Sequence, residues 1–165
     1  MSLAHARWFD SAASTAVYAA RGRNFALTML RLSHERDELR VVNDQVGAPT
    51  SARAVASGVA GVLRRLRNTA DFLAASEAAT GLYHMSAAGS TTWFEFAKTI
   101  LDDDPRRERQ ICRSIRPIRA AENPTAAARP AYSVLDNTKL ADGFGVRLLS
   151  WRVQWQTVAD ELGRG

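Results

Sequence analysis

The fold is decided by one stretch, Val41-Val42-Asn43-Asp44-Gln45-Val46-Gly47-Ala48-Pro49-Thr50-Ser51. The segment Leu39-Arg40-Val41-Val42 predicts a short strand, and residues 43–50 are rich in turn formers and predict a loop. Thr50 or Ser51 is placed to cap a following helix. The apolar residues of that helix form one stripe: Val55, Val59, Val62, Leu63 and Leu66. A strand, a loop and an amphipathic helix in succession indicate an α/β protein.

Elements of both kinds are expected outward from this stretch. Strands are predicted over residues 13–20, 81–85 and 111–118. Helices are predicted from Phe25 to about Glu38, from Thr92 to the acidic run 102–104, from about 136 to 143–145, and near the C-terminus. Asn24 is placed to cap the first of these, and Thr92 and Glu95 match a capping box. The pattern predicts helices with a small mixed sheet.

Several conspicuous side chains have structural explanations. Four aromatic residues lie on helical stripes and are expected in the core: Trp93, Phe96, Trp151 and Trp155. The run Asp102-Asp103-Asp104 at a helix end is expected to be solvated, and His84 to be structural. Gly143-Phe144-Gly145 is typical of a helix C-cap.

The bulk composition limits the classes of protein. A chain of 165 residues with 46% hydrophobic content is about one domain long. It has no apolar run of about 18 residues and no secretion signal at Met1, so a soluble, cytoplasmic protein with no membrane partner is expected. Cys112 is the only cysteine, which excludes an intrachain disulfide and a cysteine-based metal cluster.

The net charge of +5 points to an anionic partner. Of the 22 basic residues, only Lys98 and Lys139 are lysines, and the basic residues are scattered along the chain. Nucleic-acid binding is therefore disfavoured, although a nucleotide phosphate suits this charge.

Five motifs occur in a characteristic order. They are Gly22-Arg23-Asn24-Phe25, the stretch 41–50, Gly81-Leu82-Tyr83-His84, the stretch Thr91 to Ala97, and the stretch Arg129 to Leu140. This series resembles the dTDP-4-dehydrorhamnose reductase family of extended short-chain dehydrogenases. The resemblance runs from about residue 14 to the C-terminus.

The resemblance implies a nucleotide-sugar site. That family reduces dTDP-4-dehydro-L-rhamnose with NADPH or NADH during synthesis of surface polysaccharides. The motifs here resemble its C-terminal, substrate-binding half. The residues expected near the dTDP-linked substrate are Asn24, Phe25, Gln45, Gly47, Pro49, Thr50, Arg129, Pro130 and Ser133. Their chemistry agrees, because a guanidinium can grip phosphate oxygens and amides can bond sugar hydroxyls or a thymine edge. Taken alone, Arg129-Pro130 also fits an ordinary exposed loop, and 45–50 a turn with a helix cap.

The family's cofactor-binding and catalytic motifs have no counterpart in this sequence. It has no Gly-x-Gly-x-x-Gly loop of the kind that lets a backbone approach a pyrophosphate. Each of the three tyrosines lacks the lysine four residues later that short-chain dehydrogenases use to lower the phenol pKa. We therefore expect the Rossmann half to be missing, with no catalytic residue and no NADPH or NADH bound by this chain alone. Ala16 also stands where the family has a tryptophan beside the sugar.

Three hypotheses follow. In the first, the chain is a truncated reductase, inactive alone, that pairs with a separate cofactor-domain polypeptide or with a second copy. In the second, it is a noncatalytic binding or regulatory module, like the superfamily member that regulates methionine adenosyltransferase. The third, nucleic-acid binding, predicts an affinity that falls steeply with salt.

The expected truncation divides the chain in two. Residues 1–20 are predicted to be a remnant of the cofactor domain, and residues 21–165 the substrate-binding domain. Because strands of a doubly wound sheet are buried on both faces, the strand at 13–20 is expected to lack neighbours. Disorder of residues 1–20, poor solubility or dimerisation through this segment would follow.

Overall fold

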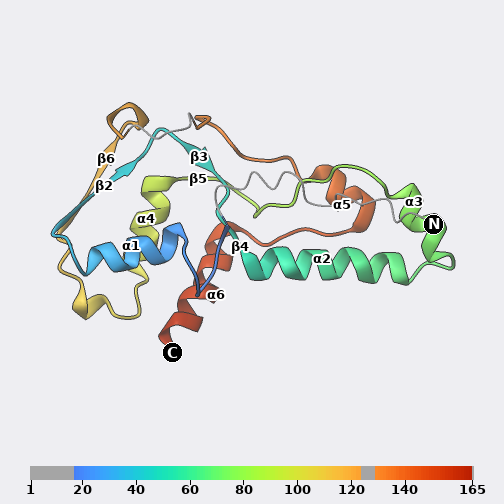
Figure 1. The fold of residues 1–165 in the computed structure, drawn as a ribbon, viewed down its shortest axis with the longest axis horizontal. Helices are drawn as coiled ribbons and strands as arrows, with labels where there is room; N and C mark the ends of the chain where they lie inside the picture. The colour runs from blue at the N-terminus through green and yellow to red at the C-terminus, as the bar shows by residue number, and fades with distance from the viewer. Residues whose placement is uncertain (1–16, 124–128, 165) are drawn as a thin grey trace.

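Helices and short strands alternate along the chain in the structure, a computed structural model that describes residues 17–123 and 129–164 (Figure 1). In chain order the elements are β1 (Val17–Tyr18), α1 (Phe25–Ser33), β2 (Glu38–Val42), β3 (Val46–Gly47), β4 (Thr50–Ser51), α2 (Ala52–Arg67), α3 (Phe72–Ala78), β5 (Thr91–Thr92), α4 (Trp93–Asp102), η1 (Arg107–Arg109), β6 (Ser114–Ile118), η2 (Ala120–Glu122), α5 (Thr138–Phe144) and α6 (Trp151–Gly163). None of these helices combines the length and the apolar character needed to cross a lipid bilayer.

The strands of the described residues form three two-stranded sheets. β1 pairs with β4 and β2 with β6 in the parallel direction, whereas β3 and β5 are antiparallel. The predicted α/β class with small mixed sheets is therefore confirmed. The strands do not join into one sheet, because four of them are only two residues long.

Helix starts follow the predicted caps. The side chains of Asn24, Ser51 and Thr92 each accept a hydrogen bond from the amide three residues later. α5 ends at Phe144 and is capped by Gly145, whose φ of 67° lies in the left-handed region that favours glycine. These boundaries were predictable because each is set by a local hydrogen bond.

α1 is shorter than predicted, since it ends at Ser33 instead of near Glu38. The Ser33 carbonyl accepts hydrogen bonds from the amides of Ile111 and Cys112, at 3.0 Å each. Residues 34–37 are all polar and give a longer helix no apolar face to bury. A contact distant in sequence therefore replaces the last predicted turn.

The strand predicted over residues 81–85 is wrong. This segment has no regular secondary structure, and its side chains pack against helices instead. The Tyr83 ring meets Phe144 of α5 edge-on, at 5.0 Å between centroids, and Met85 packs against the same cluster. Just before it lies α3, capped by Asp71, where the sequence suggested only a polar connection.

The expectation that the N-terminal strand lacks neighbours is also wrong for its described part. Residues 13–16 lie outside the described residues, but Val17 and Tyr18 pair with Thr50 and Ser51 of β4. The chain supplies this neighbour itself, because β4 passes beside β1 immediately before α2 begins.

The main core lies among α1, α4, α6, β1 and β2. Trp155 of α6 is 0% exposed and Phe96 of α4 is 1% exposed. Their ring centroids are 6.0 Å apart, and the Tyr18 ring packs on both. These two predicted core residues are confirmed, whereas Trp93 and Trp151 are half-buried at the edge of the core.

A second apolar cluster holds the other end of the molecule, where Figure 1 shows α2, α3 and α5 together. Leu66 of α2 and Leu140 and Phe144 of α5 are buried in it. Leu63, on the predicted stripe of α2, remains 56% exposed. The stripe is therefore only partly covered by the described residues.

The acidic run at the end of α4 is mostly not solvated, contrary to expectation. Asp103 accepts a hydrogen bond from the indole nitrogen of Trp155 at 3.0 Å. Asp104 is buried, and only Asp102 is exposed. The run lies against the core because Asp103 and Asp104 both accept hydrogen bonds from segments distant in sequence.

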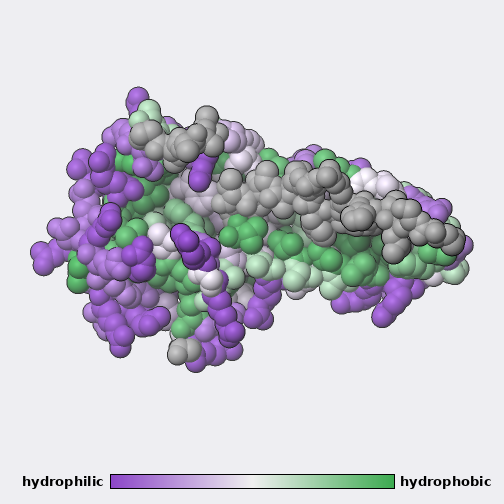
Figure 2. Space-filling model, in the orientation of Figure 1, coloured by the Kyte–Doolittle hydropathy of each residue, from purple (hydrophilic) through white to green (hydrophobic). Residues whose placement is uncertain are grey.

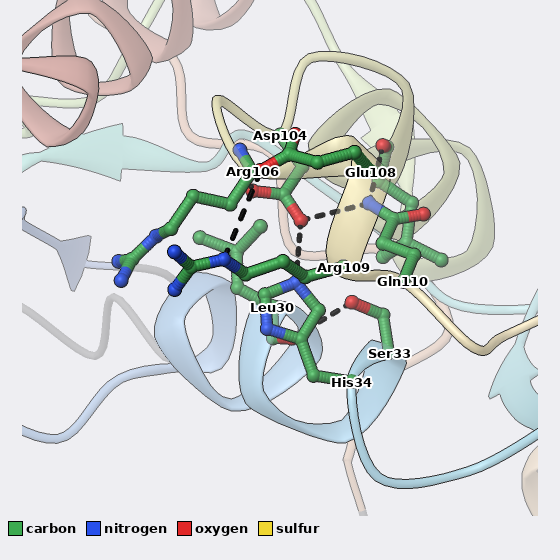
Figure 3. A network of polar contacts seen from close by, with 9 residues as sticks. Leu30, Ser33, His34, Asp104, Arg106, Glu108, Arg109 and Gln110 are labelled. Carbon is green, nitrogen blue, oxygen red and sulfur yellow. Dashed lines mark hydrogen bonds and ion pairs between the residues drawn. The ribbon is translucent and has the colours of Figure 1, made fainter.

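Asp104 ties α1 to the segment after α4 (Figure 3). Its carboxylate accepts hydrogen bonds from Gln110 at 2.8 Å, from the Arg106 amide at 2.9 Å and from His34 Nε2 at 2.9 Å. Burial alone would raise the pKa of this carboxyl, but the three hydrogen bonds outweigh that effect and hold the pKa below its ordinary value.

Asp104→Asn is expected to lower the free energy of unfolding by about 1–3 kcal/mol at pH 7, because it disrupts a buried network. A carboxyl with a lowered folded-state pKa stabilises the fold above its unfolded pKa, about 3.9. That contribution is lost as pH falls through the lower folded-state value. Urea unfolding of both proteins should therefore show a difference in the free energy of unfolding that narrows as the pH falls below about 3.9. The exposed Asp102→Asn should stay within about 0.5 kcal/mol at every pH; an equal effect at both positions would contradict the assignment.

Candidate functional site

A cleft of about 490 Å³ opens between the starts of α1 and α4, the end of β2 and the η2 segment. Its lining residues are Phe25, Met29, Arg40, Val41, Val42, Gln45, Trp93, Ala120, Asn123 and Arg129. Two arginines and no carboxylate occur among these described lining residues. The cleft therefore suits a partly apolar, anionic ligand.

Aromatic rings form one part of the cleft. Phe25 and Trp93 are the first residues of α1 and α4, and their ring centroids lie 4.8 Å apart. Phe25 also stacks on the core residue Phe96, at 5.9 Å and 17° between the planes. Because Asn24 and Thr92 cap the two helices, each aromatic side chain is held where its helix begins. Such a half-buried pair offers a flat apolar surface to a ring.

Positive charge lies on two other segments of the cleft. Arg40 comes from β2, and Arg129 follows the η2 segment. The guanidinium of Arg40 lies 3.3 Å from the Glu122 carboxylate, and both side chains are about half exposed. Arg129 is exposed. Two guanidinium groups in one cleft attract phosphate groups.

Hydrogen bonds hold the Gln45 side of the cleft to the segment that follows Arg129. The Ser133 amide and hydroxyl both donate to the Val46 carbonyl, at 2.9 and 3.1 Å. The Val46 amide donates to the Ala131 carbonyl at 2.8 Å. A β-carbon on Gly47 would lie 3.1 Å from the Ser133 hydroxyl. Gly47 and Ser133 therefore allow these two segments to approach closely, which positions Gln45 near Arg129.

The structure brings together three of the nine residues predicted from the sequence. Phe25, Gln45 and Arg129 line the cleft. Gly47 and Ser133 lie behind them and hold two segments together, and Pro130 is exposed beside Arg129.

The other three predicted residues have structural contacts. Asn24 caps α1, and its amide donates to the Ala19 carbonyl at 3.0 Å. Pro49 and Thr50 are buried, and the Thr50 hydroxyl bonds the Ala48 carbonyl and the Ala87 amide. Direct contact of these three residues with a ligand stays a prediction.

A family model described as the RmlD substrate binding domain matches residues 13–164. The chain belongs to the RmlD substrate-binding domain family. The cleft between α1, β2 and α4 lies within the matched region.

Reductases of known sequence resemble this RmlD domain along most of its length. The chain is 43% identical to the dTDP-4-dehydrorhamnose reductase of Burkholderia thailandensis over 142 residues, 84% of the chain and 47% of that protein. It is 38% identical to the Escherichia coli K12 enzyme of the same name over 149 residues, 88% of the chain and 47% of that protein. The chain thus spans about half the length of the curated relatives it matches.

Solved structures agree with the family. A dTDP-4-dehydrorhamnose reductase from Bacillus anthracis, crystallised in complex with NADP, superposes with a TM-score of 0.68 at 32% identity. An orthologue from Clostridium acetobutylicum gives the same values. The match covers 88% of this RmlD domain but only 45% and 46% of those chains.

Trp93 and Arg40 are among the cleft residues that the sequence analysis missed. Trp93 was assigned to the core because it lies on an apolar helical stripe, but as the first residue of α4 it is half-buried and lines the cleft. Arg40 was assigned no role. The alternation along β2 indicates only that Arg40 is exposed between buried Leu39 and Val41, so nothing local in the sequence assigns it to the cleft.

Two features outside the cleft bear on catalysis: the lack of a metal-binding group among the described residues, and a lysine beside a tyrosine. Among them, no group of three or more His, Cys, Asp or Glu residues could hold a metal ion. Lys139 does lie against a tyrosine, with its ammonium 4.4 Å from the centroid of the Tyr83 ring. The same ammonium donates to the Leu82 carbonyl at 3.0 Å. This is a cation–π contact that holds residues 82–83 to α5.

Proposed function

We propose that this RmlD domain binds a dTDP-linked sugar in the cleft between α1, β2 and α4. One observation carries the proposal: a half-buried aromatic pair and two arginines are among the residues that line the same cleft. A thymine ring suits the aromatic surface of Phe25 and Trp93, and a diphosphate suits the guanidinium groups. Gln45 can bond a sugar hydroxyl or the base edge. The family's relatives, named as dTDP-4-dehydrorhamnose reductases, support this class of ligand.

The nine residues take two roles in this proposal. Phe25, Gln45 and Arg129 contact the ligand. The others shape the segments that carry them: Asn24, Gly47, Pro49, Thr50, Pro130 and Ser133.

Isothermal titration of the chain with dTDP tests this binding. Saturable one-to-one binding is expected, and Arg129→Gln should weaken it by about tenfold or more, since it removes a charged hydrogen-bond donor. Arg147→Gln, an exposed arginine outside the cleft, is the matched control and should bind as the parent does. Absence of saturable dTDP binding at millimolar concentration would refute the proposal.

We also propose that a cofactor-carrying polypeptide completes the reductase by docking on an apolar groove. This groove, of about 370 Å³, lies between α2, α3 and α5, and includes Val62, Leu66, Phe72 and Phe144. Phe72 is 48% exposed, and Figure 2 shows hydrophobic residues gathered over this end of the molecule. Exposed apolar patches of this kind are typical of surfaces that another chain covers.

The length of the relatives favours this occupant. About half of each relative lies outside the matched region, and one such relative was crystallised with NADP. In this proposal residues 1–20 are the end of the cofactor domain and residues 21–165 the substrate-binding domain. A noncatalytic binding or regulatory module is the alternative, in which the groove holds a partner that restores no reductase activity.

A further inference from the structure

The ion pair between Arg40 and Glu122 lies at the edge of the cleft. Arg40 extends from β2, and Glu122 ends η2, so the pair joins two segments that border the same opening. One hydrogen bond of 3.3 Å connects the two side chains, which are 56% and 49% exposed. An exposed pair with a single long contact contributes little to stability. Arg40 can therefore exchange Glu122 for a partner that binds it more strongly, with little loss of stability.

Glu122 is held in place without Arg40. Its other carboxylate oxygen accepts a hydrogen bond from the Arg119 amide at 2.8 Å, at the start of η2. The η2 segment is attached in turn to the loop after β2, because the Ala120 amide donates to the Asp44 side chain at 2.8 Å. Loss of the Arg40 contact would thus leave the Glu122 carboxylate beside the cleft.

We propose that Arg40 is a phosphate-binding residue of this cleft and that Glu122 occupies its guanidinium when no ligand is bound. The inference rests on the proposed nucleotide-sugar function and adds a second cation and a competing anion to it. A diphosphate carries more charge than a carboxylate and can accept both arms of a guanidinium. The incoming diphosphate therefore displaces Glu122 from Arg40.

This exchange makes Glu122 a built-in competitor. Each bound diphosphate must replace an existing ion pair, so the empty site has a lower apparent affinity than Arg40 alone would give. The competition acts only on ligands that carry phosphate. Thymidine has the base but no phosphate, so its binding affinity should not depend on Arg40 or Glu122.

Titration of the full chain with dTDP, thymidine and inorganic pyrophosphate tests the proposal. Arg40→Gln should lower the affinity for dTDP and for pyrophosphate by about tenfold or more, and it should change the affinity for thymidine by no more than about twofold. Glu122→Gln should raise the affinity for dTDP by about threefold or more, because it removes the competing charge. The matched control is Arg53→Gln, whose partner Glu161 lies 2.8 Å away in an exposed pair outside this cleft. That variant should bind all three ligands as the parent does.

The outcomes separate the two proposals. If the parent binds dTDP but Arg40→Gln binds it equally well, or Glu122→Gln binds it more weakly, the role of Arg40 and Glu122 is overturned and the proposed function stands. If the parent binds no dTDP, the proposed function fails first. Circular dichroism of each variant identifies any loss of binding that comes from unfolding, and in that case Arg40→Lys, which keeps the charge, replaces Arg40→Gln in the same titrations with a smaller expected loss.

Discussion

Trp155→Ala is expected to lower the free energy of unfolding by about 3–5 kcal/mol, enough to unfold much of a marginally stable domain. Trp155 is 0% exposed and packs against the Tyr18 and Phe96 rings. Its indole nitrogen also donates to Asp103. Truncation removes the largest fully buried side chain among the described residues and leaves a cavity where α4, α6 and β1 meet.

Urea unfolding followed by far-ultraviolet circular dichroism measures this effect. Trp155→Phe keeps most of the buried ring but loses the hydrogen bond to Asp103, so a smaller loss of about 1–3 kcal/mol is expected. Val153 lies on the same helix and is 49% exposed. Val153→Ala should change stability by less than about 0.5 kcal/mol. Equal midpoints for Trp155→Ala and Val153→Ala would show that the described core is not the one that holds the fold.

The chain alone is expected to oxidise no NADPH in the presence of dTDP-4-dehydro-L-rhamnose. Its three tyrosines are followed four residues later by Gly22, Ala87 and Asp136, so no lysine is placed to lower a phenol pKa. Adding the part of the Burkholderia thailandensis reductase that lies outside the matched region should restore turnover. Loss of NADPH absorbance measures both reactions.

Variants in the groove test where that partner docks. Leu63→Glu and Phe72→Glu place a charge in an apolar surface and should reduce the restored turnover by about tenfold or more. Binding of dTDP should be unchanged, because neither residue lines the cleft. Ile111→Glu, which is equally exposed but lies outside the groove, is the control. Turnover by the chain alone would contradict this expectation. If the groove variants leave the restored turnover unchanged, the docking surface lies elsewhere.

Capping residues and apolar periodicity predicted much of the fold. The starts of α1, α2 and α4 and the end of α5 follow from Asn24, Ser51, Thr92 and Gly145, because each cap bonds within a few residues. Predictions failed where a distant segment competes for the backbone. The Ser33 carbonyl accepts hydrogen bonds from the amides of Ile111 and Cys112, and α1 ends early there.

The site could be predicted in part. The motif order indicated Phe25, Gln45 and Arg129, which meet at one cleft although they are far apart in the sequence. It gave no role to Arg40, because an exposed arginine on a strand has many explanations until its neighbours are known. The acidic run was likewise assigned to solvent, since nothing local shows that Trp155 and His34 reach Asp103 and Asp104.

The sequence by itself determined the class of fold, the starts of α1, α2 and α4, and the family, because these depend on neighbouring residues and on the order of motifs. Only the tertiary structure decided which strands pair, which carboxylates are buried, and which cation meets which anion at the cleft. These features depend on contacts between residues tens of positions apart, such as the 82 that separate Arg40 from Glu122. Neither periodicity nor capping carries information over that distance.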